Sequence, residues 1–198
     1  MLRLADFLAR STANGPGVRS VVWVQGCALA CPGCFNPEMQ DREAGEPVSE
    51  DDLVARIRAA GSEGVTFSGG EPFDQAVAVG QIARALRATG LSVICYSGFT
   101  LEELLASRAE GVGTLLAACD VLVDGPFVEA LQVASALGGS SNQRVIPLTG
   151  RYSTAELTDA PVAELAFDSG SVIASGVDHE DVIARIRERL AAEHGVTL

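Results

Sequence analysis

Three cysteines lie within one short segment, at Cys27, Cys31 and Cys34. Thiolates at this spacing can bind a single metal centre, and iron–sulfur clusters of the four-iron kind usually take four cysteine ligands. A set of three therefore leaves one iron without a protein ligand, and an open coordination position is where a metal site carries out chemistry. The spacing predicts an iron–sulfur cluster on these three cysteines, with one iron open to a ligand that is not protein.

Two other interpretations of the cysteines remain open. The spacing i, i+4, i+7 also fits the buried stripe of an amphipathic helix. Pro32 and Gly33 interrupt the segment, however, and a proline inside a helix costs about 3 kcal/mol. Zinc would need a fourth ligand, and both histidines, His179 and His194, lie far along the chain. Residues 1–17 do not resemble a signal peptide, so disulfides are not expected.

The composition limits the class of protein. A chain of 198 residues with 47% hydrophobic content is long enough for one well-packed domain. No apolar run approaches the roughly 18 residues of a membrane helix, so we expect a cytoplasmic protein without a membrane partner. The net charge of −12 argues against a nucleic-acid partner, because phosphate binding uses clustered Lys and Arg. All fourteen basic residues are Arg, which excludes a lysine Schiff base, general base or P-loop.

Strand and helix patterns alternate along the chain. We expect strands at 18–25, 64–68, 91–96, 120–124 and 144–148, and helices at about 49–60, 74–89 and, in two stretches, 100–118. Such alternation implies an α/β fold whose parallel strands are joined by right-handed crossovers. Near the C-terminus, 163–167 and 171–174 read as a hairpin, and 178–181 as the start of a last helix.

Polar and glycine-rich segments follow four of the expected strands. The cysteine segment follows the first strand, Gly69-Gly70-Glu71-Pro72 the second, Ser97 the third and Asp124 the fourth. In parallel sheets and barrels, the loops at the carboxyl ends of the strands converge on one face, where ligands bind. We therefore expect these four loops to surround one site.

The three-cysteine segment and the following Gly69-Gly70-Glu71-Pro72 resemble the radical S-adenosylmethionine (SAM) superfamily. The resemblance implies a partial (βα) barrel, a [4Fe-4S] cluster on three cysteines, and SAM bound to the fourth iron through its amino and carboxylate groups. It also implies that the backbone of Gly69, Gly70, Glu71 and Pro72 contacts the SAM amino group. We expect residues 1–148 to form this core and residues 149–198 to be an extension packed on the same domain.

Further segments resemble one group in that superfamily, the activating proteins of the anaerobic (class III) ribonucleotide reductase. In family order, these segments are 14–19, 25–27, 31–36, 123–127 and 139–143. Gly33 stands before the third cysteine, where most superfamily members have an aromatic residue and this group does not. The resemblance to other glycyl-radical activases, such as that of pyruvate formate-lyase, is weaker.

The resemblance implies a reaction and partners. One electron cleaves SAM into methionine and a 5′-deoxyadenosyl radical, which takes a hydrogen atom from a glycine α-carbon of the reductase. Such a reaction needs no general acid, base or nucleophile, in agreement with a chain that has no obvious triad. The implied partners are the glycyl-radical reductase and an electron donor such as reduced flavodoxin, and the C-terminal extension is a candidate surface for a homodimer.

Several polar residues are candidates for SAM binding. Ser97 could hydrogen-bond SAM, and the alternative is a turn serine. An acidic residue lies near SAM in related activases, which implies such a place for Asp124, although an aspartate can also simply start a turn. Arg144 or Arg19 could pair with the SAM carboxylate. Trp23 alternates with buried residues and is expected to pack in the core.

Two other functions remain open. A free-standing radical SAM enzyme would act on a small molecule or peptide without a protein partner. An iron–sulfur electron carrier is disfavoured, because carriers close their clusters with four cysteines.

Overall fold

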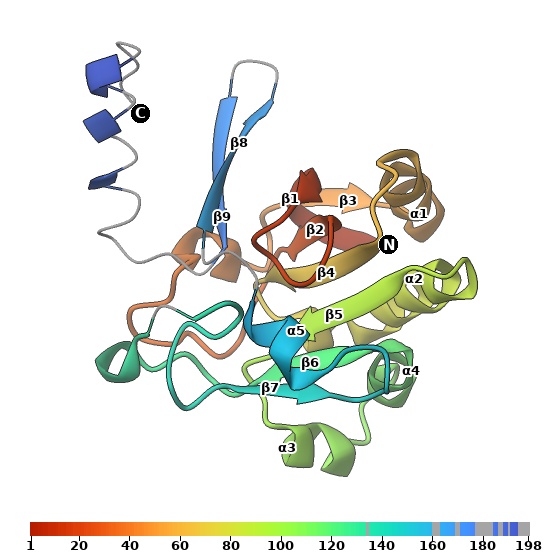
Figure 1. Cartoon of the computed structure of the whole chain (residues 1–198). Helices are drawn as coiled ribbons and strands as arrows, with labels where there is room; N and C mark the ends of the chain where they lie inside the picture. The colour runs from red at the N-terminus through yellow and green to blue at the C-terminus, as the bar shows by residue number, and fades with distance from the viewer. Residues whose placement is uncertain are drawn as a thin grey trace.

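The computed structural model describes residues 1–133, 135–159, 163–168, 171–176, 184–185, 188–189 and 191–193. Figure 1 shows a central sheet with α1, α2 and α4 on one side and a two-stranded hairpin that extends away from the body. Within these residues, no helix combines the length and apolar character needed to cross a lipid bilayer.

Seven strands form the central sheet in the order β3-β1-β2-β4-β5-β6-β7. Their bounds are β1 (Leu2–Ser11), β2 (Arg19–Val24), β3 (Glu46–Val48), β4 (Gly64–Gly69), β5 (Ser92–Tyr96), β6 (Val121–Asp124) and β7 (Arg144–Pro147). The central strands β2, β4, β5 and β6 run parallel to one another. The prediction of an α/β fold with parallel strands is confirmed for this centre of the sheet.

Both sides of the parallel centre differ from the prediction. β1 and β3, which were not predicted, pair antiparallel beside β2. β7 was predicted as a parallel strand and is antiparallel to β6. In its described residues, the segment between β6 and β7 contains the short 3-10 turn η3 (Glu129–Leu131), an isolated bridge between Gln132 and Ser140, and no α-helix. The segment joins the carboxyl end of β6 to the start of β7 at the same end of the sheet. A parallel β7 would need a crossover connection to the opposite end of the sheet.

The helices are α1 (Glu50–Ala59), α2 (Ala76–Ala88), α3 (Leu101–Ala106), α4 (Val112–Ala118) and α5 (Thr154–Thr158). Ser49 caps α1 by accepting a hydrogen bond from the backbone N–H of Asp52. Thr100 and Glu103 form a capping box at the start of α3. The helix expected from residue 74 begins later, because the 3-10 turn η2 (Pro72–Gln75) precedes α2.

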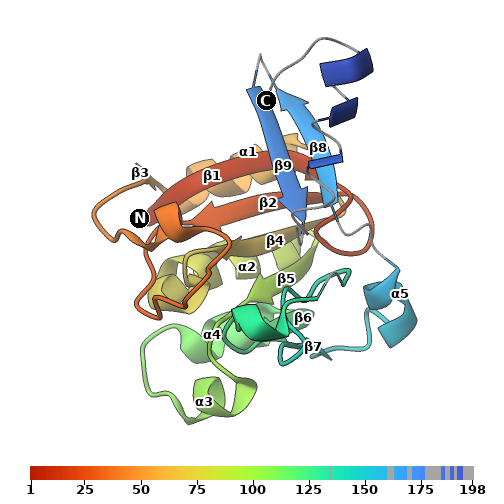
Figure 2. The ribbon, with the colours of Figure 1, turned by 90° about the vertical axis from the view of Figure 1, so that its left-hand side faces the viewer.

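The parallel strands present alternate residues to two different cores. On the face covered by α1, α2 and α4, Phe67, Cys95 and Leu122 join the large cluster. On the opposite face, Ile94, Val121 and Val123 pack with Leu137 and with Leu157 of α5. Figure 2 shows α5 away from the three helices that cover the first face. Leu157 is 2% exposed, and burial of such a side chain contributes roughly 1.5–3 kcal/mol.

Arg19 is fully buried at the start of β2, on the face opposite the helices. Its Nε donates to Thr66 Oγ1 at 2.8 Å, its Nη1 to Ser92 Oγ at 2.8 Å and its Nη2 to the carbonyl of Val65 at 2.6 Å. These bonds join β2, β4 and β5 at their amino ends, opposite the end from which the cysteine loop leaves. Arg19 therefore stabilises the sheet, and its guanidinium is not available to a SAM carboxylate.

The C-terminal hairpin is present as expected. β8 (Ala163–Asp168) and β9 (Ser171–Gly176) pair antiparallel, with Ala163 opposite Gly176 and Asp168 opposite Ser171. The expected start of a last helix, at 178–181, lies outside the described residues. Farther on, residues 184–185, 188–189 and 191–193 are helical.

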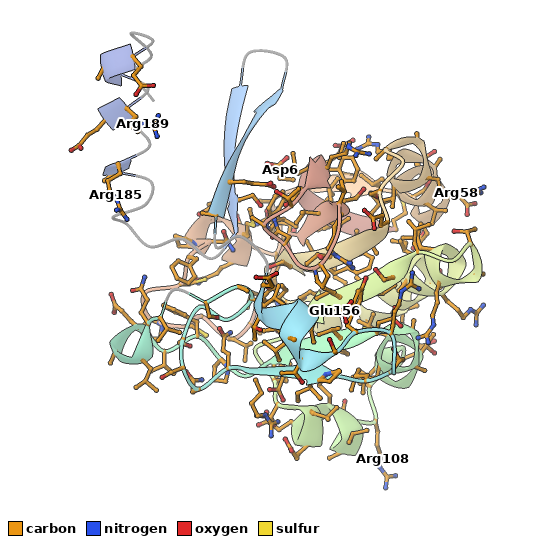
Figure 3. The ribbon with its side chains drawn as sticks, viewed as in Figure 1. Asp6, Arg58, Arg108, Glu156, Arg185 and Arg189 are labelled. Carbon is orange, nitrogen blue, oxygen red and sulfur yellow. The ribbon has the colours of Figure 1, made fainter. Side chains whose placement is uncertain are left out.

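Replacing Arg19 with Lys should lower the free energy of unfolding by about 3 kcal/mol, because an ammonium group cannot reproduce the divergent hydrogen bonds of the guanidinium. Urea unfolding of the cluster-free protein, followed by circular dichroism, measures this change. The matched control is Arg58→Lys, on an exposed side chain that points away from the body in Figure 3; it should change the value by no more than about 0.5 kcal/mol. Equal stability of the two variants would contradict the structural role of Arg19.

Candidate metal centre and cofactor site

A cavity of about 450 Å³ lies at the carboxyl ends of the parallel strands. Among its lining residues are Cys27, Cys31, Cys34, Gly69, Gly70, Glu71, Ser97, Gly98 and Gly125. The structure thus brings together the cysteine loop (residues 26–36), the GGEP loop (residues 69–72) and the segments after β5 and β6. Of the predicted site residues, Pro72 and Asp124 are not among the lining residues.

Backbone hydrogen bonds anchor the cysteine loop where it leaves β2. Gly26 donates to the carbonyl of Met39 at 2.8 Å, and Cys27 donates to the carbonyl of Gln40 at 3.1 Å. The N–H of Glu71 donates to the carbonyl of Gly26 at 2.9 Å. A Cβ on Gly70 would lie 2.3 Å from that same carbonyl oxygen. Glycine at position 70 therefore allows the two loops to meet by their backbones.

Within the loop, the chain turns between the second and third cysteines. The N–H of Cys34 donates to the carbonyl of Cys31 at 3.2 Å, and Gly33 has a φ of +71°. A Cβ on Gly33 would lie 2.7 Å from the carboxyl carbon of Glu129. Both the positive φ and this close contact explain why glycine, and not an aromatic residue, precedes the third cysteine.

The three thiols fit a multi-iron cluster. Each is half-buried and each lines the same cavity. In the described part of the chain, no three or more His, Cys, Asp or Glu side chains converge closely enough to hold one metal ion. A four-iron cluster does not need such convergence, because each cysteine binds a different iron. Burial raises the pKa of the Cys27 thiol, while the backbone near Leu29 and Ala30 opposes this effect.

Glu71 is 1% exposed and connects two of the loops. Its Oε1 accepts hydrogen bonds from the N–H of Phe73 at 2.9 Å and from Ser97 Oγ at 3.0 Å. Its Oε2 accepts one from the N–H of Gly98 at 2.8 Å. Burial raises the pKa of Glu71 to about 7, although these three hydrogen bonds lower it. The carboxyl group is thus occupied in fixing the GGEP loop to the segment after β5.

Ser97 lines the cavity, and its hydroxyl is engaged within the protein. It donates to Glu71 and accepts from the N–H of Phe99 at 3.1 Å. Ser97 therefore acts as a turn serine, the alternative to SAM binding, and it also holds the Glu71 carboxyl in place.

Asp124 lies on the helix-covered face of the sheet rather than in the cavity lining. Its Oδ2 accepts from the N–H of Leu101, the first residue of α3, at 2.6 Å. Both of its oxygens also bind the guanidinium of Arg144, which in turn binds Glu102. The alternation along β6 explains this placement, because Leu122, two residues earlier, packs against the helices.

Side chains of the strands form part of the cavity wall and were missed as site residues. The cavity is lined by Trp23, Ser68 and Tyr96, which lie at the carboxyl ends of β2, β4 and β5. Trp23 was predicted to be a core residue only. It is 9% exposed, packs in a small core cluster and also lines the cavity. The period-two alternation carried the missing signal, because these residues share a face with Val21, Thr66 and Ile94.

The long segment after β6 closes another side of the cavity. The ring of Phe127 lies 4.5 Å from that of Phe35 in the cysteine loop, measured between centroids. Gln143 folds the segment: its Oε1 accepts from the N–H of Gly139 at 2.8 Å, and its Nε2 donates to the carbonyl of Gly125 at 3.1 Å. The residues 139–143 therefore shape the wall that packs on the cysteine loop.

Residues 13–146 match the 4Fe-4S single cluster domain family. The anaerobic ribonucleoside-triphosphate reductase-activating protein of Salmonella typhi is 30% identical over 154 residues, which cover 73% of this chain and 97% of that protein. The pyruvate formate-lyase 1-activating enzyme of Escherichia coli (strain K12) is 34% identical over 95 residues, or 45% of this chain and 39% of that enzyme.

Among solved structures, QueE from Escherichia coli has a TM-score of 0.41 and 18% identity, over 50% of this chain and 53% of that one. This likeness is too low to add to the argument.

The chain belongs to the 4Fe-4S single cluster domain family and, within the radical SAM proteins, to the group of anaerobic ribonucleoside-triphosphate reductase-activating proteins. The family predicted from the motifs is confirmed. Its cofactors are a [4Fe-4S] cluster and SAM, and the three-cysteine loop is consistent with them.

Gly70→Ala should separate the GGEP and cysteine loops, because the added Cβ would lie 2.3 Å from the carbonyl oxygen of Gly26. We expect SAM cleavage to fall by about 10²-fold, the loss that a displacement of about 1 Å can cause. The measurement is 5′-deoxyadenosine formed per iron bound after anaerobic reconstitution. Gly113→Ala, where a Cβ has no neighbour within 4 Å, is the control and should be fully active; a fully active Gly70→Ala would contradict the close approach.

Glu71 should make the stability of the cluster-free protein depend on pH. Because folding raises its pKa from 4.5 to about 7, its contribution is fully present below pH 4.5 and is lost as the pH rises through about 7. The shift corresponds to about 3 kcal/mol. Urea unfolding at pH values from 4.5 to 8 should show this decline in the wild-type protein relative to Glu71→Gln. Parallel pH profiles of the two proteins would rule out a raised pKa.

Proposed function

We propose that this chain cleaves SAM reductively at a [4Fe-4S] cluster held by Cys27, Cys31 and Cys34, and generates a glycyl radical on an anaerobic ribonucleotide reductase. The observation that carries the proposal is one cavity, lined by all three thiols and by the loop after the neighbouring parallel strand. A cluster and a SAM molecule bound there would lie next to each other.

When bound, the reduced cluster and SAM supply, from one electron, methionine and a 5′-deoxyadenosyl radical, which takes one hydrogen atom from a glycine α-carbon. The residues of this chain position these reactants and exclude water. Gly69, Gly70 and Glu71, which line the cavity, would hold the amino end of SAM with backbone groups, beside the cysteine loop that Glu71 contacts. Pro72 lies outside the lining and would act by shaping this loop. Ser97 and Asp124 would act as positioning residues, through Glu71 and through α3.

Aromatic residues form part of the cavity wall. Trp23, Phe35 and Phe127 are among the lining residues. The volume of about 450 Å³ is in the lower part of the range for small-molecule sites.

The proposal also includes the electron donor, the oligomeric state and the cellular location of the protein. The reaction consumes one electron from outside the chain, and we infer reduced flavodoxin or a similar protein as its source. A homodimer and a cytoplasmic location, both expected from the sequence, remain predictions.

The test is anaerobic reconstitution with iron and sulfide, reduction by dithionite and addition of SAM, with and without the reductase. Cys31→Ala should lose cluster absorbance, 5′-deoxyadenosine and the glycyl-radical signal in electron paramagnetic resonance. Cys119→Ala, at a buried position away from the cavity, should retain all three. Deoxyadenosine without a glycyl radical would favour the free-standing enzyme. A bound cluster that yields no deoxyadenosine would favour an electron carrier and contradict the proposal.

A further inference from the structure

The C-terminal hairpin contributes directly to the wall of the cavity. Ser175 and Gly176, the last two residues of β9, line the same cavity as the three cysteines. Both follow residue 146, where the match to the 4Fe-4S family ends. One wall of the cavity therefore comes from a part of the chain to which the family match assigns no role.

A buried amide joins this wall to the core. Asn14, which also lines the cavity, donates from Nδ2 to Ser175 Oγ at 2.6 Å and to Ser11 Oγ at 2.7 Å. Ser175 is 6% exposed and Asn14 is also 6% exposed. The hydrogen bond is thus shielded from water, and it fixes the end of β9 against the segment that precedes β2.

A second anchor comes from the residue opposite Ser175 in the hairpin. Glu164 pairs with Ser175 in the β8–β9 register. Its Oε2 accepts from both the N–H and the hydroxyl of Thr12, at 2.7 and 2.8 Å. One cross-strand pair therefore holds both strands to residues 11–14. The rest of the hairpin extends away from the body in Figure 1, and its far end does so in Figure 2.

The segment that leads to the hairpin is also packed on the core. Tyr152 donates to Ser92 Oγ at 2.6 Å, and Leu157 is buried in the cluster opposite the helices. The base of the hairpin is therefore held by the contacts of Tyr152 and Leu157, which precede it, and by those of Glu164 and Ser175 within it.

The two strands leave an edge that leads to the cavity. In the described residues, β8 and β9 pair only with each other, and an unpaired strand edge is a template for another extended chain. β9 runs from Ser171 to Gly176 and ends in the cavity wall. Gly176, with a φ of +107°, has no side chain to narrow the cavity at that point.

Resting on the proposed function, we propose that β9 is the docking edge for the reductase: an extended, glycine-bearing backbone segment of the reductase pairs with β9 and is guided into the cavity at Ser175 and Gly176. Strand addition supplies affinity through backbone hydrogen bonds and requires little of the partner's side chains. This suits a substrate whose reacting atom is a backbone α-carbon. Glu164 and Ser175 are positioning residues, because they hold the edge at the cavity.

The test uses the reconstituted protein and the intact reductase. In the double variant Glu164→Ala/Ser175→Ala, the KM for the reductase in glycyl-radical formation, and the Kd from anaerobic calorimetry, should rise about tenfold. Cluster content should be unchanged, and any loss of partner-free SAM cleavage should be much smaller than tenfold. The single variant Glu164→Gln, in which Ser175 is kept, retains an oxygen acceptor for Thr12 and should bind the reductase as the wild type does. Glu110→Ala, on an exposed residue, is the surface control.

Hydrogen exchange of the wild-type protein gives an independent readout. The backbone amides of residues 171–176 should become protected when the reductase binds. An unchanged KM in the double variant, no protection of 171–176, or an equal loss of partner-free SAM cleavage would each overturn the proposal. A wild-type protein that forms no glycyl radical would contradict the proposed function alone, since protection or its absence at 171–176 still decides whether β9 is the docking edge.

Discussion

The backbone hydrogen bond from Glu71 to Gly26 is the contact on which the site depends, because it joins the loop that carries the cysteines to the loop proposed for SAM. It continues the pairing of β2 with β4 beyond the ends of both strands. Two local features make it available: Gly70 has no side chain to block the approach, and the buried carboxyl of Glu71 fixes its own loop to the segment after β5. A parallel sheet thus positions three loops through backbone hydrogen bonds and the buried carboxyl of Glu71.

The division of the sheet into two faces explains which polar residues reach the cavity. Residues that share a face with Ile94 and Val121 point away from α1, α2 and α4, and this face continues into the cavity through Trp23 and Tyr96. Residues of the other parity meet the helices. Asp124 has that parity, so its carboxylate binds the start of α3 and Arg144. The end of a strand therefore does not by itself place a side chain in the site; its register does.

The sequence predicted the parts of the protein that have a strong local pattern. The four parallel strands are short apolar runs, and the cysteine and GGEP loops carry spacings with few alternatives. β1 was missed because Arg3, Asp6 and Arg10 interrupt its apolar pattern, and β3 because it has only three residues. The direction of β7 and the joining of Ser175 to Asn14 depend on contacts between distant residues. Local periodicity contains no information about such contacts.

The C-terminal extension completes a face that the family core leaves to loops. Ile94, Val121 and Val123 need a cover, and Leu157 and Tyr152 supply part of it. Because burial of that apolar surface is favourable, the segment that carries the hairpin is held by the stability of the core. The hydrogen bonds of Glu164 and Ser175 to residues 12 and 14 then only need to orient a strand whose base is already close. The packing of Leu157 and Tyr152 and the hydrogen bonds of Glu164 and Ser175 thus act on the same segment, and the bond of Ser175 lies at the cavity.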